Sequence, residues 1–117
     1  MYDITKKETF IQCEKYYRFL IHDLSKRNVK VLLIGNKSDL EDNREVSYSE
    51  ALQFAESNNY YYIETSCFKN KNVFEAFEKI IIETYKDIKL EEKKNENHSK
   101  TIKLYNSTNL THKKTAC

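Results

Sequence analysis

The pattern of apolar and polar positions changes several times along the chain, and these changes predict three strands and three helices. Residues 1–5, MYDIT, have the character of a strand end, and residues 29–35, VKVLLIG, form a nearly continuous apolar run. Residues 60–65, YYYIET, form the third such segment. A run like 29–35 is typical of a strand that lies in a parallel sheet and is covered by helices on both faces.

Helices are predicted between and after these strands, where apolar residues recur at helical spacing. Each predicted helix opens with a capping pair three residues apart: Thr5 with Glu8, Ser47 with Glu50, and Asn72 with Glu75. The first helix is expected to end near residues 26–28 and the second near Asn58. The third is expected to end near Lys89, where the hydrophobic pattern is lost.

This order of elements predicts the α/β fold class, with a three-layer parallel sheet of three strands alternating with three helices. Residues 1–89 are predicted to form one domain. Residues 90–117 are polar and rich in Lys and Asn, and are expected to form a flexible tail. Ligands of such folds bind at the C-terminal ends of the strands, so the segments that start at Asn36 and Thr65 become candidate sites.

Composition narrows the functional classes. The 117 residues carry a net charge of only +2, which does not favour nucleic acid as a partner. Gly35 is the only glycine, and a glycine-rich phosphate loop needs more than one glycine. Three widely spaced cysteines indicate reduced thiols rather than a disulfide framework or a zinc site. No apolar run approaches the ~18 residues of a membrane span.

The segment Asn36-Lys37-Ser38-Asp39 directly follows the apolar run 29–35. An ionised carboxylate only accepts hydrogen bonds, and guanine presents two adjacent donors, its N1–H and its 2-amino group. Adenine would leave that carboxylate unpaired, at a cost. The aliphatic stem of Lys37 can cover a face of a base while its ammonium stays in water. The spacing N-K-x-D therefore favours guanine recognition.

The second segment is Glu64-Thr65-Ser66-Cys67, at the end of the third strand. Small polar residues there can turn the chain and aim backbone N–H groups into the same crevice, where the O6 acceptor of guanine needs a donor. Either segment alone also fits a polar loop after a strand. Their joint occurrence, each at a strand end, favours the nucleotide-binding interpretation.

At these residues the chain resembles the Rab proteins, small GTPases of the Ras superfamily. The run MYDIT-KKETF is similar to the Rab segment that enters the helix after the second switch. LLIGNKSDLEDNREVS resembles the guanine-specificity loop, and YIETSC resembles the last base-contacting motif, where the family usually has Ala in place of Cys67. The resemblance covers about residues 1–88 and implies the C-terminal half of a GTPase domain.

The resemblance implies a role for each matching position. Asp39 would bind the base N1 and 2-amino groups, Lys37 would pack along the base plane, and Asn36 would brace the loop. Ser66 would support the turn, and the backbone N–H of Cys67 would reach O6. The predicted nucleotide-binding residues are Asn36, Lys37, Asp39, Thr65, Ser66 and Cys67.

The parts of the family that grip phosphate have no counterpart in this sequence. The phosphate loop G-x-x-x-x-G-K-[ST] needs two glycines, and Leu32 occupies the position where D-x-x-G would need Asp. We predict no catalytic and no metal-binding residue here, so GTP or GDP with Mg²⁺ belong to the complete protein. The chain is expected to begin where the fourth strand of the family ends, which would expose a sheet edge and apolar helix surface.

The end of the chain is basic and finishes with Lys113-Lys114-Thr115-Ala116-Cys117. This resembles the lipidated tail of Rab proteins, and one prenyl chain on Cys117 with a basic segment could anchor the protein to a membrane. Such a protein would be cytoplasmic and peripheral on the cytosolic face of an endomembrane. An unmodified tail is the alternative.

Two functions remain open at the level of sequence. In the first, the complete protein is a Rab-like GTPase that recruits Rab effectors and the prenylation machinery in vesicle-mediated transport. In the second, this chain is a truncated interaction module that neither binds nucleotide tightly nor hydrolyses GTP. An unrelated α/β nucleotide-binding protein is disfavoured because the two motifs agree.

Overall fold

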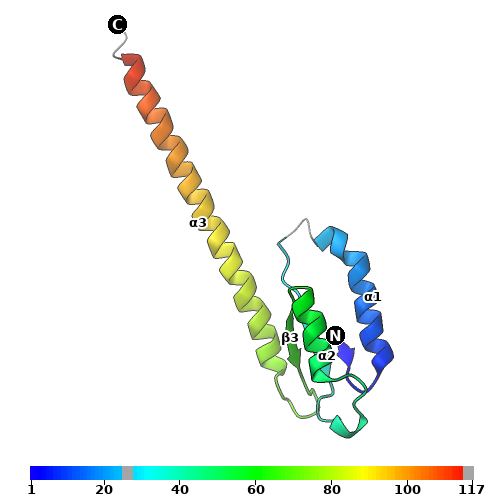
Figure 1. Cartoon of the computed structure of the whole chain (residues 1–117). Helices are drawn as coiled ribbons and strands as arrows, with labels where there is room; N and C mark the ends of the chain where they lie inside the picture. Colours follow the sequence, from blue (N-terminus) through cyan, green and yellow to red (C-terminus); the bar gives the residue numbers. More distant parts are fainter. Residues whose placement is uncertain (25–27, 115–117) are drawn as a thin grey trace. The chain divides into compact units, whose positions relative to one another are not determined.

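The computed structural model describes residues 1–24 and 28–114 of the chain (Figure 1). In these residues the elements follow the predicted order of strand and helix. They are β1 (Tyr2–Asp3), α1 (Lys7–Leu24), β2 (Leu32–Asn36), the short 3-10 helix η1 (Glu41–Asn43), α2 (Tyr48–Ser57), β3 (Tyr61–Glu64) and α3 (Val73–Lys114). The predicted α/β class is confirmed.

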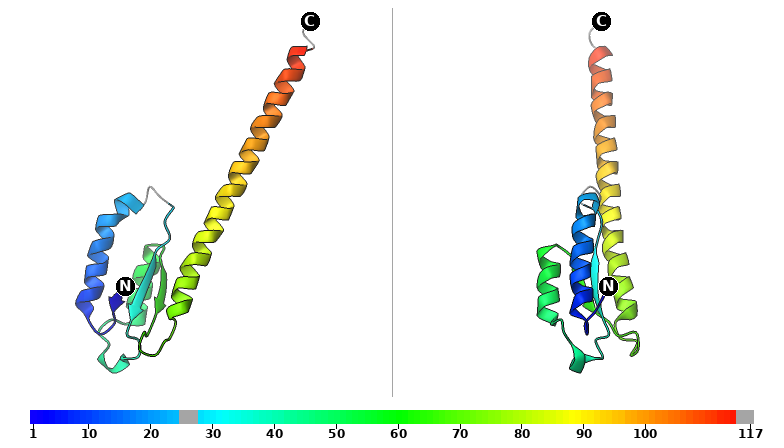
Figure 2. Two further views of the ribbon diagram at one scale, coloured as in Figure 1. Left: turned by 180° about the vertical axis from the view of Figure 1, so that it is seen from behind. Right: turned by 90° about the vertical axis from the view of Figure 1, so that its right-hand side faces the viewer.

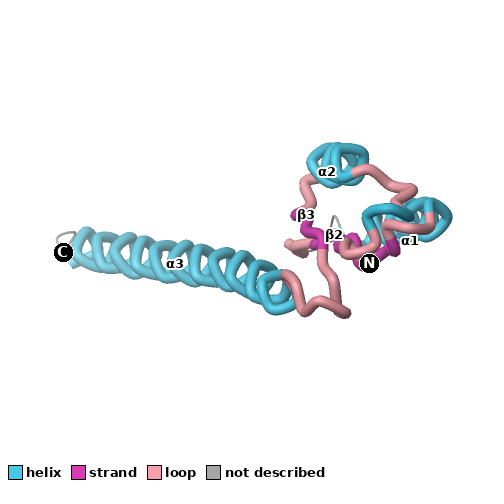
Figure 3. The backbone as a smooth tube through the Cα atoms, turned by 90° about the horizontal axis from the view of Figure 1, so that it is seen from below, coloured by secondary structure: helices cyan, strands magenta, loops and turns pink. Residues whose placement is uncertain are grey.

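The three strands form one parallel sheet in the order β1-β2-β3. Tyr2 pairs with Gly35, and Gly35 pairs in turn with Glu64, so the C-terminal ends of β2 and β3 lie at the same edge. Helices α1 and α2 cover one face of this sheet (Figure 2). The opening turns of α3 lie on the other face (Figure 3).

The hydrophobic core lies on the face that α1 and α2 cover. Its buried members are Tyr2, Ile4, Phe10, Leu33, Val46, Ala51, Ala55 and Tyr62. The ring of Phe10 meets the rings of Tyr2 and Phe54 edge to face, with centroids 5.0 and 5.6 Å apart. Phe10 comes from α1, and Ala51 and Ala55 come from α2; all three are buried.

Strand β2 is buried on one face rather than on both, so this part of the prediction is wrong. Leu33 and Gly35 are buried, whereas Leu32 and Ile34 are only half-buried. The reason lies in α3, whose one buried side chain among residues 73–101 is Ala76. The helix therefore leaves the second face of the sheet incompletely covered.

The N-terminal starts of the first two helices were predicted with different success. Ser47 is the N-cap of α2, and its hydroxyl accepts from the Glu50 N–H at 3.1 Å, as predicted. Helix α1 begins at Lys7 rather than at Thr5, because the Thr5 hydroxyl donates to the Asp3 carboxylate instead. Glu45, from a distant loop, accepts from the Lys7 N–H at 2.7 Å.

Helix α3 differs most from the prediction. Asn72 precedes it with φ 58°, and its side-chain amide donates to the Glu64 carbonyl rather than capping the helix. The helix also continues past Lys89 to Lys114. Residues 90–101 contain neither Gly nor Pro and are rich in Glu and Lys, which favour helix without any apolar face to pack.

The chain divides into two units, one of residues 1–84 and one from Tyr85 onward. In the first unit, apolar side chains on α1 and α3 are exposed, as the sequence suggested. Phe19 is 90% exposed, and Phe74 and Phe77 are 72% and 61% exposed. Phe74 and Phe77 thus leave part of the apolar surface of α3 uncovered within the described residues.

Candidate functional site

A pocket of about 440 Å³ opens where β2 and β3 end. We call it the strand-end pocket, and it is lined by Asn36, Lys37, Asp39, Leu40, Cys67 and Phe68. Four of the six predicted nucleotide-binding residues are among these. Thr65 and Ser66 are not, because they are buried beneath the pocket with exposed fractions of 3% and 0%.

The buried pair Thr65 and Ser66 ties the two loops of the pocket together. The Ser66 hydroxyl donates to Asp39 Oδ1 at 2.6 Å, and the Thr65 hydroxyl donates to Asn36 Oδ1 at 3.2 Å. The Ser38 N–H donates to the Thr65 carbonyl at 3.0 Å. These bonds fix the orientation of the Asp39 carboxylate before any ligand arrives.

Lys37 is held more firmly than the sequence suggested. Its φ of 67° lies in the left-handed region that favours glycine. Its ammonium lies 2.7 Å from Asp3 Oδ2, a partner that the sequence did not indicate. Burial alone would raise the pKa of the Asp3 carboxyl, but hydrogen bonds from Lys37 and Thr5 outweigh burial and lower that pKa to about 2. The Lys37 stem is thus fixed across the pocket by a charge at the end of β1.

The loop that carries Cys67 is closed on itself. Ser66 and Lys71 exchange backbone hydrogen bonds of 3.0 and 2.9 Å, and the Ser66 hydroxyl accepts from the Lys69 N–H at 3.0 Å. The Asn70 N–H reaches the Cys67 carbonyl at 3.3 Å. The loop therefore presents Cys67, whose thiol is free and exposed, on a short, internally bonded turn.

Behind the pocket, a polar network fixes the end of β3. Arg44 meets Glu64 through two hydrogen bonds of 2.7 and 2.8 Å, and Glu64 accepts from the Tyr62 hydroxyl at 2.8 Å. The Tyr62 hydroxyl in turn bonds the Tyr2 hydroxyl at 2.7 Å. Burial would raise the pKa of Glu64, but the Arg44 guanidinium lowers it. Burial raises the pKa of Tyr2 to about 12.

The same network explains why the chain needs its glycine immediately before the site. A Cβ at Gly35 would lie 2.8 Å from the Tyr2 hydroxyl oxygen. The hydroxyl of Tyr2 therefore occupies the space that any larger residue would need. Gly35 serves close packing between β1 and β2, and its φ is not positive.

The pocket chemistry suits a flat polar ligand with adjacent donors. Asp39 is oriented by one hydrogen bond, yet an ionised carboxylate has about four acceptor positions. Sequence alone did not identify Leu40 and Phe68 as pocket residues, nor Asp3 as the partner of Lys37. Asp3 lies in the segment MYDIT, which resembles Rab proteins, but the sequence gave no indication of what this residue does.

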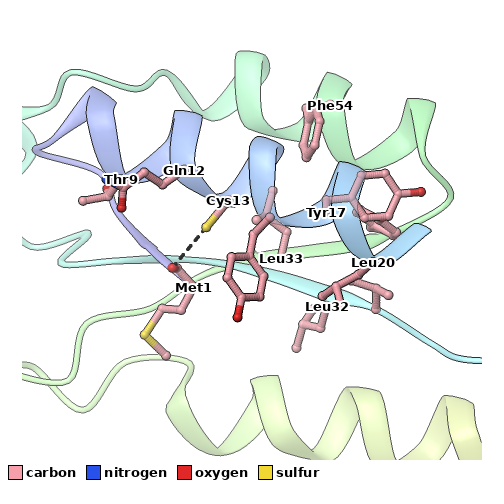
Figure 4. Close-up of a pocket in the computed structure, with 12 residues that line it drawn as sticks. Met1, Thr9, Gln12, Cys13, Tyr17, Leu20, Leu32, Leu33 and Phe54 are labelled. Atoms are coloured by element: carbon pink, nitrogen blue, oxygen red, sulfur yellow. Dashed lines mark hydrogen bonds between the residues drawn. The ribbon is translucent and has the colours of Figure 1, made fainter. Parts of the chain in front are cut away.

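A second hollow, of about 540 Å³, lies between α1 and β2, and we call it the α1 groove (Figure 4). It is lined by Met1, Thr9, Gln12, Cys13, Tyr16, Tyr17, Leu20, Val31, Leu32, Leu33, Phe54 and Tyr60. The Cys13 thiol donates to the Met1 carbonyl at 3.2 Å. The groove is mainly aromatic and aliphatic, and holds none of the predicted site residues.

Within residues 1–24 and 28–114, no three His, Cys, Asp or Glu side chains cluster as they would around a metal ion. In the same residues no helix has the length and apolarity needed to cross a bilayer. Cys117, the predicted lipidation site, lies outside the described residues.

Parallel α/β sheets bind their ligands at the carboxyl ends of the strands, and that is where the two hydrogen-bonded loops lie. The model of the Ras family matches residues 1–86, and the chain therefore belongs to the Ras family of small GTPases, with Rab-like sequence.

Several relatives carry Rab names. The Ras-related protein RABA5a of Arabidopsis thaliana is 41% identical over 85 residues, which is 73% of this chain and 38% of that protein. The Ras-related protein Rab-11C of Dictyostelium discoideum is 38% identical over the same shares. The Ras-related protein Rab-25 of Bos taurus is 36% identical over 101 residues, 86% of this chain and 46% of that protein. The chain thus spans less than half the length of these relatives.

Proposed function

We propose that this chain supplies the guanine-recognition part of a Rab-like small GTPase. The observation that carries the proposal is the Asp39 carboxylate, held by Ser66 at 2.6 Å in a pocket that Lys37 also lines. The guanine N1–H and 2-amino group would donate to this carboxylate. Cys67 would offer its backbone N–H to O6.

Selectivity against adenine follows from the donors and acceptors. Adenine has an acceptor at N1 and no 2-amino group, so it would leave the carboxylate without donors. Charge-assisted hydrogen bonds contribute roughly 1.5–3 kcal/mol each, and an unpaired carboxylate adds a desolvation cost. The pocket therefore supports a preference for guanine over adenine, mainly through Asp39.

Lys37 would contribute shape rather than a hydrogen bond to the base. Its ammonium is already paired with Asp3, so its aliphatic stem is the part that remains to contact a ligand. Holding the stem in place reduces the side-chain entropy lost on binding. We propose that Asp3 is for this reason part of the base site, although it does not touch the base.

In the complete protein, GTP or GDP would be bound together with Mg²⁺, and the role would be in vesicle-mediated transport, as in the Rab family. The phosphates and the metal would be held by sequence motifs that this chain does not contain. Prenylation at Cys117, a peripheral place on the cytosolic face of an endomembrane, and contacts with effectors and prenylation machinery belong to the same proposal. Residues 1–89 would be the GTPase part and residues 90–117 the tail.

A second candidate function is a non-catalytic interaction module, and one observation favours it. The α1 groove leaves apolar side chains exposed, including Tyr16 at 72% and Leu20 at 42%. Exposed apolar patches of this kind mark surfaces that another chain covers. The groove and the strand-end pocket share no residue, so binding of another chain in the groove would not depend on nucleotide binding in the pocket.

The test is a titration of the 117-residue chain with GMP and AMP, followed by nuclear magnetic resonance. Two charge-assisted bonds set against the cost of association predict a dissociation constant of roughly millimolar for GMP. Shifts should concentrate at the strand-end pocket and be much smaller with AMP. The matched control is Asp39→Ala, which should reduce the GMP shifts to the level of the AMP shifts. Equal shifts with GMP and AMP would refute the proposal.

A further inference from the structure

One aromatic side chain stands out at the strand-end pocket. Phe68 lines the pocket next to Cys67, yet it is 85% exposed. Single exposed apolar residues are common and need no explanation. Phe68 differs from other exposed apolar residues because it lines the pocket. It is the one aromatic residue among the six that line it, and these include the polar residues Asn36 and Asp39.

The hydrogen bonds of the loop fix the backbone that carries Phe68. Hydrogen bonds between Ser66 and Lys71 close the turn on both sides of it, and the Ser66 hydroxyl accepts from the Lys69 N–H. Ser66 is also the residue that orients Asp39. The position of Phe68 is therefore coupled to that of the carboxylate through one buried side chain.

We propose that Phe68 is an aromatic wall of the strand-end pocket on which the purine ring stacks, while the Lys37 stem provides aliphatic contact. The proposal rests on the proposed guanine recognition and assigns a further residue to it. Bases stack on aromatic side chains regardless of their hydrogen-bonding edges, because every base has a π-face. Phe68 would thus set affinity, and Asp39 would set selectivity.

Lys69 adds a detail that fits this role. Its ammonium lies 5.6 Å from the centroid of the Phe68 ring, within the range of a cation–π contact. A cation on the ring restrains its orientation before a ligand binds. It also places positive charge beside the pocket, which suits a nucleotide more than a neutral base.

The first test measures GMP and IMP affinities of the full chain and its variants. IMP keeps the N1–H but lacks the 2-amino group, so the ratio of GMP to IMP affinity reports on Asp39. Phe68→Ala should weaken both nucleotides about five- to a hundredfold and leave their ratio unchanged. Phe19→Ala is the matched control, because Phe19 is 90% exposed on α1 away from the pocket.

The second test uses fluorescence, because the chain contains no tryptophan. Phe68→Trp should retain GMP affinity, and its emission should be quenched as GMP binds. Phe19→Trp should show no such quenching. Circular dichroism of each variant checks that folding is unchanged. Phe68→Leu is a further variant, because it keeps a large apolar side chain without the aromatic ring.

The outcomes separate the two proposals. If wild type binds GMP, Phe68→Ala binds it equally well, and Phe68→Trp is quenched no more than Phe19→Trp, the role of Phe68 is refuted while guanine recognition stands. If the GMP to IMP ratio falls with affinity in Phe68→Ala, Phe68 acts on the carboxylate and the stacking role is refuted. If wild type does not bind GMP, both proposals fail.

Discussion

The strand-end pocket and the α1 groove are hollows of similar size, about 440 and 540 Å³, but their walls are held differently. In the pocket, each of three polar residues has a partner behind it: Asp3 for Lys37, Ser66 for Asp39, and Thr65 for Asn36. In the groove, the walls are mainly aromatic and aliphatic side chains. The pocket is arranged in advance for a polar ligand, whereas the groove would be stabilised only by burial of its apolar side chains against another surface.

The largest expected effect is on the network that supports the pocket. Arg44 and Glu64 have side chains only 15% and 13% exposed, so Arg44→Ala leaves a carboxylate with little solvent and no partner guanidinium. We expect a loss of about 3 kcal/mol in the free energy of unfolding, measured by urea denaturation. GMP binding should fall with the folded population.

A matched double variant tests the cause. Arg44→Ala with Glu64→Gln removes the unpaired charge and should recover part of the lost stability. If Arg44→Ala and the double variant are equally unstable, the ion pair does not account for the effect. If both are as stable as wild type, the network does not support the end of β3.

The next effect concerns the bond that orients the carboxylate. Ser66→Ala removes the donor to Asp39 and the acceptor of the Lys69 N–H, and should lower the free energy of unfolding by about 1–2 kcal/mol. GMP affinity should fall further than this loss of folded protein explains. Thr84→Ala is the control, since Thr84 bonds only within its own helix. Unchanged GMP affinity in Ser66→Ala would contradict prearrangement.

A smaller effect is expected from the charge that holds Lys37. The Asp3 pKa falls from 3.8 to about 2 on folding, so its contribution is present above about pH 4 and is lost as pH falls toward 2. Asp3→Asn should lower stability at pH 7 by about 1 kcal/mol, a value discounted because Lys37 is half exposed. Urea denaturation at pH 7, 4 and 2 measures it.

The control for that experiment is Asp42→Asn, at an exposed aspartate of η1. The difference between wild type and Asp3→Asn should be much smaller at pH 2 than at pH 7, and Asp42→Asn gives the baseline for removing an exposed carboxylate. A difference as large at pH 2 as at pH 7 would mean that Asp3 stabilises the fold by something other than its charge.

The smallest effect on folding is expected in the α1 groove. Tyr16 is 72% exposed, so Tyr16→Ser should change the free energy of unfolding by less than about 0.5 kcal/mol. The same change should reduce binding of an apolar fluorescent dye by the chain. A loss of stability above about 1 kcal/mol would show that the groove already packs like a core, and the contrast with the strand-end pocket would be lost.

Local patterns predicted the fold well where a strong period was present. The apolar run 29–35 and the segment 60–65 gave two of the strands, and Ser47 with Glu50 gave the start of α2. Helix α3 was predicted to end too early. Its later residues follow intrinsic helix propensity, which the loss of an apolar face concealed.

The candidate site was predicted in part. Sequence placed Asn36, Lys37 and Asp39 at a strand end, and the structure finds all three in one pocket. It did not predict that Asp3 pairs with Lys37, because contacts between distant segments depend on strand register rather than on local pattern. It likewise missed Phe68, since an exposed aromatic residue in a polar loop gives no periodic signal.

The most direct test of the central claim exchanges the hydrogen-bonding pattern of Asp39. In Asp39→Asn, the side chain keeps one acceptor and gains a donor, which matches the N1–H and C2 carbonyl of xanthine instead of guanine. GMP and XMP affinities of wild type and variant would be measured side by side. We predict that the preference moves from GMP to XMP by more than about tenfold. An unchanged preference in Asp39→Asn would contradict guanine recognition by this pocket.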